Sequence, residues 1–440
     1  MTDSFDDEHA LFSVLVNDEG QHSLWPAAAT VPAGWSVARP PADRATSLAY
    51  VNQHWTDLRP RTLAQRLRKD EETTMSGRTE TAATPFSGMA VDHVKFYVTD
   101  LAGSTDWLAR GYGLTVYARS DGEPEPGGAR SVGLGGRDIR LLLSEPLAGT
   151  HPGAEYVEKH GDGVADIALR VPDAGAAFAE AVRRGARPVS APAAHGNVIT
   201  ATITGIGDIT HTFVQRSDGG DDGTLPGLTP SGPGTGAPDC GLREIDHFAI
   251  CVEPAEMDLT VDFYRAVLDF ELIFTERIEV DDQVMITKVV ESRSGGVTFT
   301  LVTPDRSRAT GHLDEFLKSH NGPGVQHIAF ATDDIVRSVD ALASRGVDFL
   351  PTPAAYYRVL PERLTPLRYS VSELERLNIL IDEDHDGQLF QIFTRSVHPR
   401  GTLFLEVIER MGARSFGSGN IKALYQAVEY EQGRGAGNAT

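Results

Sequence analysis

The stretch "IDHFAICVEPAEMDLTVDFYRAVLDFELIFTER", residues 245–277, decides the fold because its pattern occurs twice in the chain. Residues 91–120, "VDHVKFYVTDLAGSTDWLARGYGLTVYARS", align with it. Each copy reads as a strand, an amphipathic helix and a second strand, since apolar residues alternate at its ends and recur with helical spacing between them. A repeated supersecondary unit indicates an internal duplication. We therefore expect two related bodies in this chain.

A second pair of stretches repeats in the same order. Residues 161–193 align with residues 322–354, and short alternating segments such as 297–304 and 387–394 follow the helical parts. Each body therefore holds two βα units, and each unit is completed by further strands. The predicted fold class is α+β, with four βαβββ modules paired in two halves and a small α+β domain in front of them.

Two polar segments separate the bodies. Residues 69–88 are rich in Thr and Ser, and residues 217–241 are dominated by Gly, Pro and Asp, compositions that bury too little apolar surface to fold alone. The expected organisation is a small domain at 1–68, a linker at 69–88, a half without metal at 89–216, a linker at 217–241, a catalytic half with a C-terminal lid helix at 242–432, and a tail at 433–440.

Charge and composition limit the class of partner. The formal net charge of −22 opposes binding to nucleic acid and to anionic membranes, because such binding needs clustered Lys and Arg. Cys240 and Cys251 are the only cysteines, too few for a disulfide framework. The N-terminus has no basic and apolar leader, and no apolar run of about 18 residues occurs. We expect a cytoplasmic protein that acts on small molecules or proteins.

Three residues have the spacing of a metal site. His247 and His327 stand at corresponding places early in their units, and Glu406 lies in the predicted strand "GTLFLEVIER". Two imidazoles and one carboxylate form the facial triad typical of non-haem Fe(II). A histidine on a strand is more often a packing residue than a ligand. In the first body, however, His93 matches His247 while Asp166 replaces His327, which favours one working site after duplication.

A weaker metal-like signal is set aside. Asp382, Asp384, Asp386 and Gly387 begin like a calcium loop, but Phe393 stands at the twelfth position, where a bidentate Glu is required. We therefore predict a hairpin turn at 382–387.

Residues 89–432 resemble the 4-hydroxyphenylpyruvate dioxygenase and 4-hydroxymandelate synthase family of the vicinal oxygen chelate fold. The resemblance is carried by "DHF" at 246–248, "VQHIAF" at 325–330, "LFQIF" at 389–393, "LFLEVIER" at 403–410 and "SFGSGNIKALYQAVEYEQ" at 415–432. It implies Fe(II) held by His247, His327 and Glu406, with 4-hydroxyphenylpyruvate and O2 as substrates.

The two branches of this family differ in product. After oxidative decarboxylation, dioxygenases form homogentisate by ring hydroxylation with side-chain migration, whereas synthases form 4-hydroxymandelate by benzylic hydroxylation. Dioxygenases usually carry Phe where this chain has Ile421 and Tyr425, and Pro and Asn where it has Thr300 and Val302; the synthases look closer to this chain. The resemblance favours an Fe(II)-dependent 4-hydroxymandelate synthase. The alternatives are a dioxygenase that forms homogentisate and a non-catalytic binding or scaffold protein.

The resemblance also implies a substrate pocket. Gln326 and Gln391 are expected to hydrogen-bond to substrate or to ligands, Phe393 to stack on the ring, and Thr300 and Tyr425 to offer hydroxyls to the phenol. The implied substrate-binding residues are Thr287, Thr300, Val302, Gln326, Gln391, Phe393, Phe416, Asn420, Ile421 and Tyr425. The last two lie on a predicted amphipathic helix that should close the pocket as a lid.

Residues 11–63 resemble the MbtH-like proteins, small accessory proteins that bind adenylation domains of nonribosomal peptide synthetases. The resemblance is carried by a set of spaced residues: Asn17, Glu19, Gln21, Ser23, Trp25, Pro26, Pro32, Gly34, Trp35, Leu48 and "WTDLRP" at 55–60. It implies partner binding by Ser23, Leu24, Trp25 and Trp35, with the two tryptophans forming a cleft. Hydroxymandelate is the precursor of hydroxyphenylglycine in nonribosomal peptides, so we expect a role in antibiotic biosynthesis. The oligomeric state, a homodimer included, stays open.

Overall fold

The computed structural model describes residues 11–51 apart from 18–21, 28, 33, 45 and 48–49, and residues 84–420 apart from 121–127, 217–224, 226, 232–237, 281 and 418. The chain divides into two units, Met1–Ala83 and Thr84–Thr440. In the described part of the chain, no helix is long and apolar enough to cross a membrane.

The first unit contains a three-stranded antiparallel sheet of order β2-β1-β3. Its strands are β1 (Phe12–Asn17), β2 (His22–Pro26) and β3 (Trp35–Ala42). In the register, Trp25 stands opposite Ser13 and Trp35 stands opposite Asn17 on the central strand. Because cross-strand partners and alternate residues share a face, both tryptophans lie on one face of the sheet, on the two strands that flank β1.

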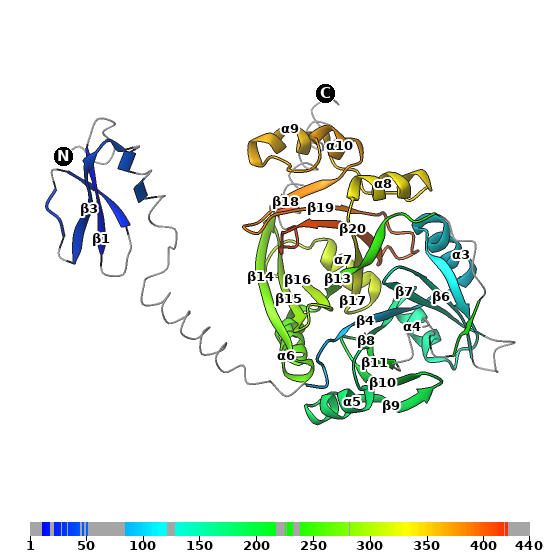
Figure 1. Ribbon diagram of the computed structural model, residues 1–440. Helices are drawn as coiled ribbons and strands as arrows, with labels where there is room; N and C mark the ends of the chain where they lie inside the picture. Colours follow the sequence, from blue (N-terminus) through cyan, green and yellow to red (C-terminus); the bar gives the residue numbers. More distant parts are fainter. Residues whose placement is uncertain are drawn as a thin grey trace. The chain divides into compact units, whose positions relative to one another are not determined.

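The second unit contains two large curved sheets (Figure 1). The first sheet has the order β12-β5-β6-β7-β4-β8-β11-β10-β9, and the second has the order β14-β15-β16-β13-β17-β20-β19-β18. The elements of the first half are β4 (Ala90–Tyr97), α3 (Leu101–Asp106), the π-helix η1 (Trp107–Gly111), β5 (Thr115–Arg119), β6 (Ala129–Gly136), β7 (Ile139–Pro146), α4 (Pro152–His160), β8 (Gly163–Arg170), α5 (Ala174–Arg183), β9 (Pro188–His195), β10 (Val198–Thr204), β11 (Thr210–Arg216) and β12 (Thr229–Pro230).

The second half repeats this plan with insertions. Its elements are β13 (Leu242–Cys251), the 3-10 helix η2 (Pro254–Glu256), α6 (Met257–Leu268), β14 (Phe270–Val280), β15 (Gln283–Ser292), β16 (Thr298–Pro304), α7 (His312–His320), β17 (Gly324–Thr332), α8 (Ile335–Ser344), α9 (Ala354–Arg363), α10 (Val371–Arg376), β18 (Leu380–Glu383), β19 (Gln388–Phe393) and β20 (Phe404–Met411). The insertion between α8 and β18 forms α9 and α10, which lie beside β18 at one end of the second sheet (Figure 1).

Strand pairing confirms the duplicated fold. β4 pairs in parallel with β7 and antiparallel with β8, just as β13 pairs in parallel with β16 and antiparallel with β17. β8 pairs in parallel with β11, as β17 does with β20. The predicted architecture of four βαβββ modules in two halves is therefore what the structure shows.

Three of the four corresponding helices begin in the same way. Asp100, Asp173 and Asp334 precede α3, α5 and α8, and each carboxylate accepts a hydrogen bond from a backbone N–H of the first turn. Such caps satisfy donors that have no partner inside the helix. On α6, residues spaced along one face, from Met257 through Val261 and Tyr264 to Leu268, are buried against the sheet.

Part of the segment 217–241, expected to be a linker, packs onto the first half. Leu225 and Leu228 are buried in a cluster with Ala118 of β5, and β12 pairs with β5 at the sheet edge. Two leucines supply enough apolar surface to attach a stretch that is otherwise rich in Gly and Pro.

Asp92, a buried carboxylate in β4, accepts several hydrogen bonds. Asp92 is 1 % exposed; its oxygens accept hydrogen bonds from Arg216 at 2.7 and 2.8 Å and from Arg170 at 3.2 Å, and lie 2.8 Å from His93 Nδ1. Burial alone would raise the pKa of Asp92, but the hydrogen bonds from Arg216 and His93 outweigh it and hold the pKa well below the usual range.

We predict that Asp92→Ala destabilises the second unit by about 3–5 kcal/mol, because it removes the buried carboxylate that accepts two hydrogen bonds from the Arg216 guanidinium, whose side chain is 8 % exposed. Chemical denaturation measures the difference. The exposed pair of Asp106 and Arg110 supplies the control, and Asp106→Ala should cost less than about 0.5 kcal/mol. The folded-state pKa of Asp92 lies below the ordinary value of about 4, so its stabilising effect is complete above that pH and is lost as pH falls toward the folded-state pKa; the difference between wild type and Asp92→Ala should therefore shrink below about pH 4. An Asp92→Ala protein as stable as the control would contradict the assignment.

Candidate metal centre

Three neighbouring strands place the predicted ligands on one concave face. His247 of β13 stands opposite Ala329 of β17, and Ala329 stands opposite Glu406 of β20. His327 lies two residues before Ala329 on the same face and opposite Ala249. The small side chain of Ala329 leaves the space between His247 and Glu406 open.

The three side chains converge. Oε2 of Glu406 lies 3.2 Å from Nε2 of His327 and 3.6 Å from Nε2 of His247, and the three ligand atoms lie within 4.8 Å of one another. His247 and Glu406 are 3 % and 2 % exposed. Donors bound to one ion at about 2.1 Å come to lie about 3 Å apart, so the geometry fits a metal ion. Two imidazole nitrogens and one carboxylate oxygen fit non-haem Fe(II).

A second layer of contacts orients His247. Its Nδ1 lies 2.7 Å from Oδ1 of Asp246, and Arg410 donates to both oxygens of Asp246 at 2.8 and 2.9 Å. Burial would raise the pKa of Asp246, but the hydrogen bonds from His247 and Arg410 hold it below its usual range. An ionised Asp246 accepts a hydrogen bond from Nδ1–H of His247, so the lone pair of Nε2 is directed at the site.

Aromatic rings hold His327. It stacks on Phe404 with a centroid separation of 4.9 Å and meets the edge of Phe393 at 5.7 Å. Burial lowers the pKa of His327, which keeps the imidazole in the neutral form that a metal requires.

The triad forms part of the wall of a cavity of about 410 Å³. Eight of the ten predicted substrate-binding residues line it: Thr287, Thr300, Val302, Gln326, Gln391, Phe393, Phe416 and Asn420. Ile421 and Tyr425 lie outside the described residues. The Thr300 hydroxyl is buried and has no hydrogen-bond partner within the described part, as expected of a group that a bound ligand would satisfy.

The cavity also contains residues that sequence reasoning missed. Phe274, Glu276 and Ile278 come from β14, Met285 from β15 and His312 from the start of α7. Glu276 stands directly opposite Thr287 in the register, a pairing that alternation along β14 does not by itself predict.

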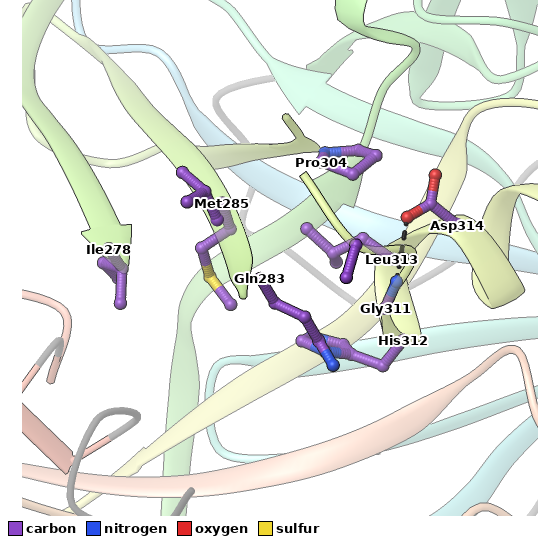
Figure 2. Close-up of a pocket in the computed structure, with 10 residues that line it drawn as sticks. Ile278, Gln283, Met285, Pro304, Gly311, His312, Leu313 and Asp314 are labelled. Carbon is purple, nitrogen blue, oxygen red and sulfur yellow. Dashed lines mark hydrogen bonds between the residues drawn. The ribbon is translucent and has the colours of Figure 1, made fainter. Parts of the chain in front are cut away.

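One end of the cavity narrows beside the first turn of α7. Ile278, Met285, His312 and Leu313 line both the cavity and a smaller pocket of about 20 Å³, shown in Figure 2. There the Gly311 N–H donates to Asp314 at 3.0 Å, which caps α7 (Figure 2).

The other end carries a polar network. Tyr356 of α9 donates to Oδ1 of Asn420 at 2.8 Å, and Nδ2 of Asn420 donates to Oε1 of Gln391 at 3.4 Å. Asn420 is fully buried, so these contacts tie the residue before Ile421 to the cavity wall.

The predicted hairpin turn at 382–387 is confirmed, because it joins β18 to β19. Its carboxylates bind backbone: Asp384 accepts from the N–H groups of Arg414 and Ser415 at 2.7 Å each, and Asp382 accepts from Gly419 at 2.8 Å. The turn therefore holds the segment that leads to Asn420.

We predict that Gly417→Ala lowers the kcat of the metal-dependent reaction by at least about tenfold, while the amount of bound metal stays unchanged. Gly417 has φ of 72°, and a Cβ there would overlap the amide of Gln391, which must then leave its place in the cavity. Gly295 also has a positive φ, 73°, but no atom near the position of a Cβ, so Gly295→Ala isolates backbone strain. Equal kcat values for both variants would refute the role given to Gln391.

The first half carries different residues at the equivalent positions. By register, Lys95 replaces Ala249, Asp166 replaces His327 and Thr212 replaces Glu406, while His93 keeps the place of His247. These residues do not form a group with metal-binding geometry, whereas His247, His327 and Glu406 do, within the described residues.

The predicted partner-binding residues of the first unit lie on its sheet. Ser23, Leu24 and Trp25 belong to β2, Trp35 begins β3, and all four are half-exposed. The indole N–H of Trp25 donates to the carbonyl of Thr30 at 3.2 Å.

Three protein-family models match the chain. An MbtH-like protein model matches residues 1–67, a model described as hydroxyphenylpyruvate dioxygenase, N-terminal, matches 135–225, and one of the Glyoxalase/Bleomycin resistance protein/Dioxygenase superfamily matches 244–392.

Relatives agree with these matches. The 4-hydroxyphenylpyruvate dioxygenase of Dictyostelium discoideum is 36% identical over 363 residues, which cover 78% of this chain and 97% of that protein. The enzyme of the same name from Yarrowia lipolytica is 32% identical, with 78% and 92% covered. A solved structure of a mutant 4-hydroxymandelate synthase from Streptomyces coelicolor is 40% identical, with a TM-score of 0.70 and 78% and 98% covered. The chain belongs to the family of 4-hydroxyphenylpyruvate dioxygenases and 4-hydroxymandelate synthases with the vicinal oxygen chelate fold, and carries an MbtH-like domain at its N-terminal end.

Proposed function

We propose that this chain is an Fe(II)-dependent 4-hydroxymandelate synthase, which converts 4-hydroxyphenylpyruvate and O2 to 4-hydroxymandelate and CO2. The observation that carries the proposal is the buried triad of His247, His327 and Glu406 in the wall of a cavity of about 410 Å³. That volume suits a small ligand.

His247, His327 and Glu406 would hold Fe(II), which would supply the redox chemistry for decarboxylation and oxygen insertion. Asp246 and Arg410 keep His247 oriented, and the phenyl rings of Phe393 and Phe404 keep His327 in place.

The other residues that line the cavity fall into an apolar group and a polar group. Phe274, Met285 and Leu313 give the ring an apolar surface that excludes water, while Gln326 and Gln391 offer amides to the polar end of the substrate. The Thr300 hydroxyl, which lacks a partner in the described part, is suited to the phenol or to a water that binds it.

The preference for a synthase rests on the pocket. Thr300 and Val302 line the cavity, at two positions where the synthases resemble this chain more closely than dioxygenases do. A barrier difference of about 1.4 kcal/mol shifts a product ratio tenfold, so a change of shape at such positions suffices.

The MbtH-like domain is suited to binding a protein partner. We propose that Ser23, Leu24, Trp25 and Trp35 bind an adenylation domain of a nonribosomal peptide synthetase in the cytoplasm. Trp25 and Trp35 share one half-exposed face, which supports a surface for a partner side chain. Co-purification of the full chain with such an adenylation domain tests this part separately.

Gas exchange tests the catalytic class. Iron-loaded protein given 4-hydroxyphenylpyruvate should consume one O2 and release one CO2 per substrate, and removal of iron should stop both. A non-catalytic binding protein would take up substrate without consuming O2, which would contradict the proposal. The dioxygenase alternative has the same gas stoichiometry and is separated by its product.

A further inference from the structure

The first half contains a cavity of its own, of about 590 Å³, at the place equivalent to the metal cavity. Residues of β4, β7, α4, β8, β9, β10 and β11 line it, among them His93, Lys95, Asp166, Thr202 and Thr212. The proposed synthase activity does not use this cavity.

Strand register places opposite charges side by side in it. Lys95 of β4 stands opposite Asp166 of β8, with Leu142 of β7 on its other side. Such partners share a face and have Cβ atoms about 5 Å apart. In the second half Ala249 and His327 occupy these two positions. Compared with the second half, the first half therefore has a carboxylate in place of His327 and an ammonium group in place of the Ala249 methyl group.

Asp166 is a buried acid with an open oxygen. It is 5 % exposed, and its Oδ2 accepts a hydrogen bond from Thr212 Oγ1 at 2.7 Å, but its Oδ1 has no partner in the described part of the chain. Burial raises the pKa of Asp166 to about 6, so the carboxylate is still mostly ionised at pH 7. A buried acceptor without a donor is costly unless a ligand supplies one.

Within the described residues, Lys95 forms no ion pair with a carboxylate, Asp166 included. Its Nζ donates to the Tyr97 hydroxyl at 3.3 Å and lies 4.8 Å from the centre of that ring. A ligand that carries both charges close together would satisfy both groups at once.

We propose that this cavity binds a zwitterionic α-amino acid, whose carboxylate pairs with Lys95 and whose ammonium pairs with Asp166. The two charged groups of an α-amino acid sit on one carbon, which matches two side chains on directly opposed positions. Tyr97 and Leu142 offer apolar surface to its side chain. A metal ion is disfavoured because the Lys95 ammonium would repel it, and a simple carboxylate would leave Asp166 without a counter-charge.

Isothermal titration calorimetry on the iron-loaded full chain tests this, with each proteinogenic L-α-amino acid titrated singly at millimolar concentrations. At least one should bind saturably. Its N-acetyl derivative lacks the ammonium and its amide lacks the carboxylate, so each should bind at least about tenfold more weakly. Absence of saturable binding for every amino acid, or equal binding of the N-acetyl form, would overturn the proposal.

Variants locate the site. Lys95→Met and Asp166→Asn should each weaken binding at least about tenfold, whereas Lys95→Arg should largely restore it. Asp166→Asn keeps the shape of the side chain and removes a buried charge, so it decides the matter even where Lys95→Met folds poorly. His327→Ala, in the other cavity, should leave binding unchanged. Binding that survives both Lys95→Met and Asp166→Asn, or that is lost in His327→Ala, would overturn the assignment to this cavity.

Discussion

Replacing Glu406 by alanine should lower turnover of 4-hydroxyphenylpyruvate by at least about 10³-fold, equivalent to about 4 kcal/mol. Glu406 contributes the only carboxylate of the triad, and its Oε2 lies within 3.6 Å of both histidine Nε2 atoms. Without it, two neutral imidazoles remain, too few ligands to retain Fe(II) firmly. Both activity and bound iron, measured by elemental analysis, should fall together.

The fold should survive this change. Glu406 is 2 % exposed and forms no ion pair with Lys or Arg among the described residues, so its removal leaves no buried Lys or Arg there without a counter-charge. Circular dichroism and the melting temperature check this. Glu271 of β14 pairs with Arg293 and has a side chain that is 63% exposed, so Glu271→Ala is a matched control that should keep full activity. Iron-dependent turnover retained by Glu406→Ala would refute the ligand assignment.

Replacing Ile421 by phenylalanine should shift the product ratio toward homogentisate by at least about tenfold, or about 1.4 kcal/mol between the two barriers. Ile421 is the next residue in sequence after Asn420, whose buried amide donates to Gln391 in the cavity wall. A larger aromatic group next to the substrate ring should restrict its rotation and favour reaction at the ring over the benzylic carbon.

Ile421→Leu keeps the side-chain volume and should leave the ratio unchanged. Chromatographic separation of homogentisate from 4-hydroxymandelate measures the ratio for both variants. An active Ile421→Phe enzyme with the wild-type ratio would count against the steric account of product choice.

The fold was largely predictable because duplication makes the strands and helices visible twice. His247 and His327 could be recognised for the same reason, since they occupy equivalent places in two units and Glu406 follows in a strand of the second. Position within a repeat is a property of the sequence alone, so no three-dimensional information was needed to single out the two histidines. Glu406 was suggested instead by its predicted strand and by the family resemblance.

The remaining features depend on strand register and long-range contacts. Asp246 and Arg410 are 164 residues apart along the chain, and only the sheet brings them together. Thr212 takes the place of Glu406 in the first half, which only the pairing of β8 with β11 reveals. Glu276 joins the cavity because β14 pairs with β15 in one particular register, which alternation along β14 does not specify. Leu225 and Leu228 lie in a segment whose average composition is that of a linker, so composition did not predict that they are buried.

The identity of the product tests the central claim most directly. Iron-loaded protein is incubated with 4-hydroxyphenylpyruvate and O2, and the products are separated by chromatography and identified by mass and retention against authentic standards. The account predicts 4-hydroxymandelate as the main product. Homogentisate as the main product would contradict it.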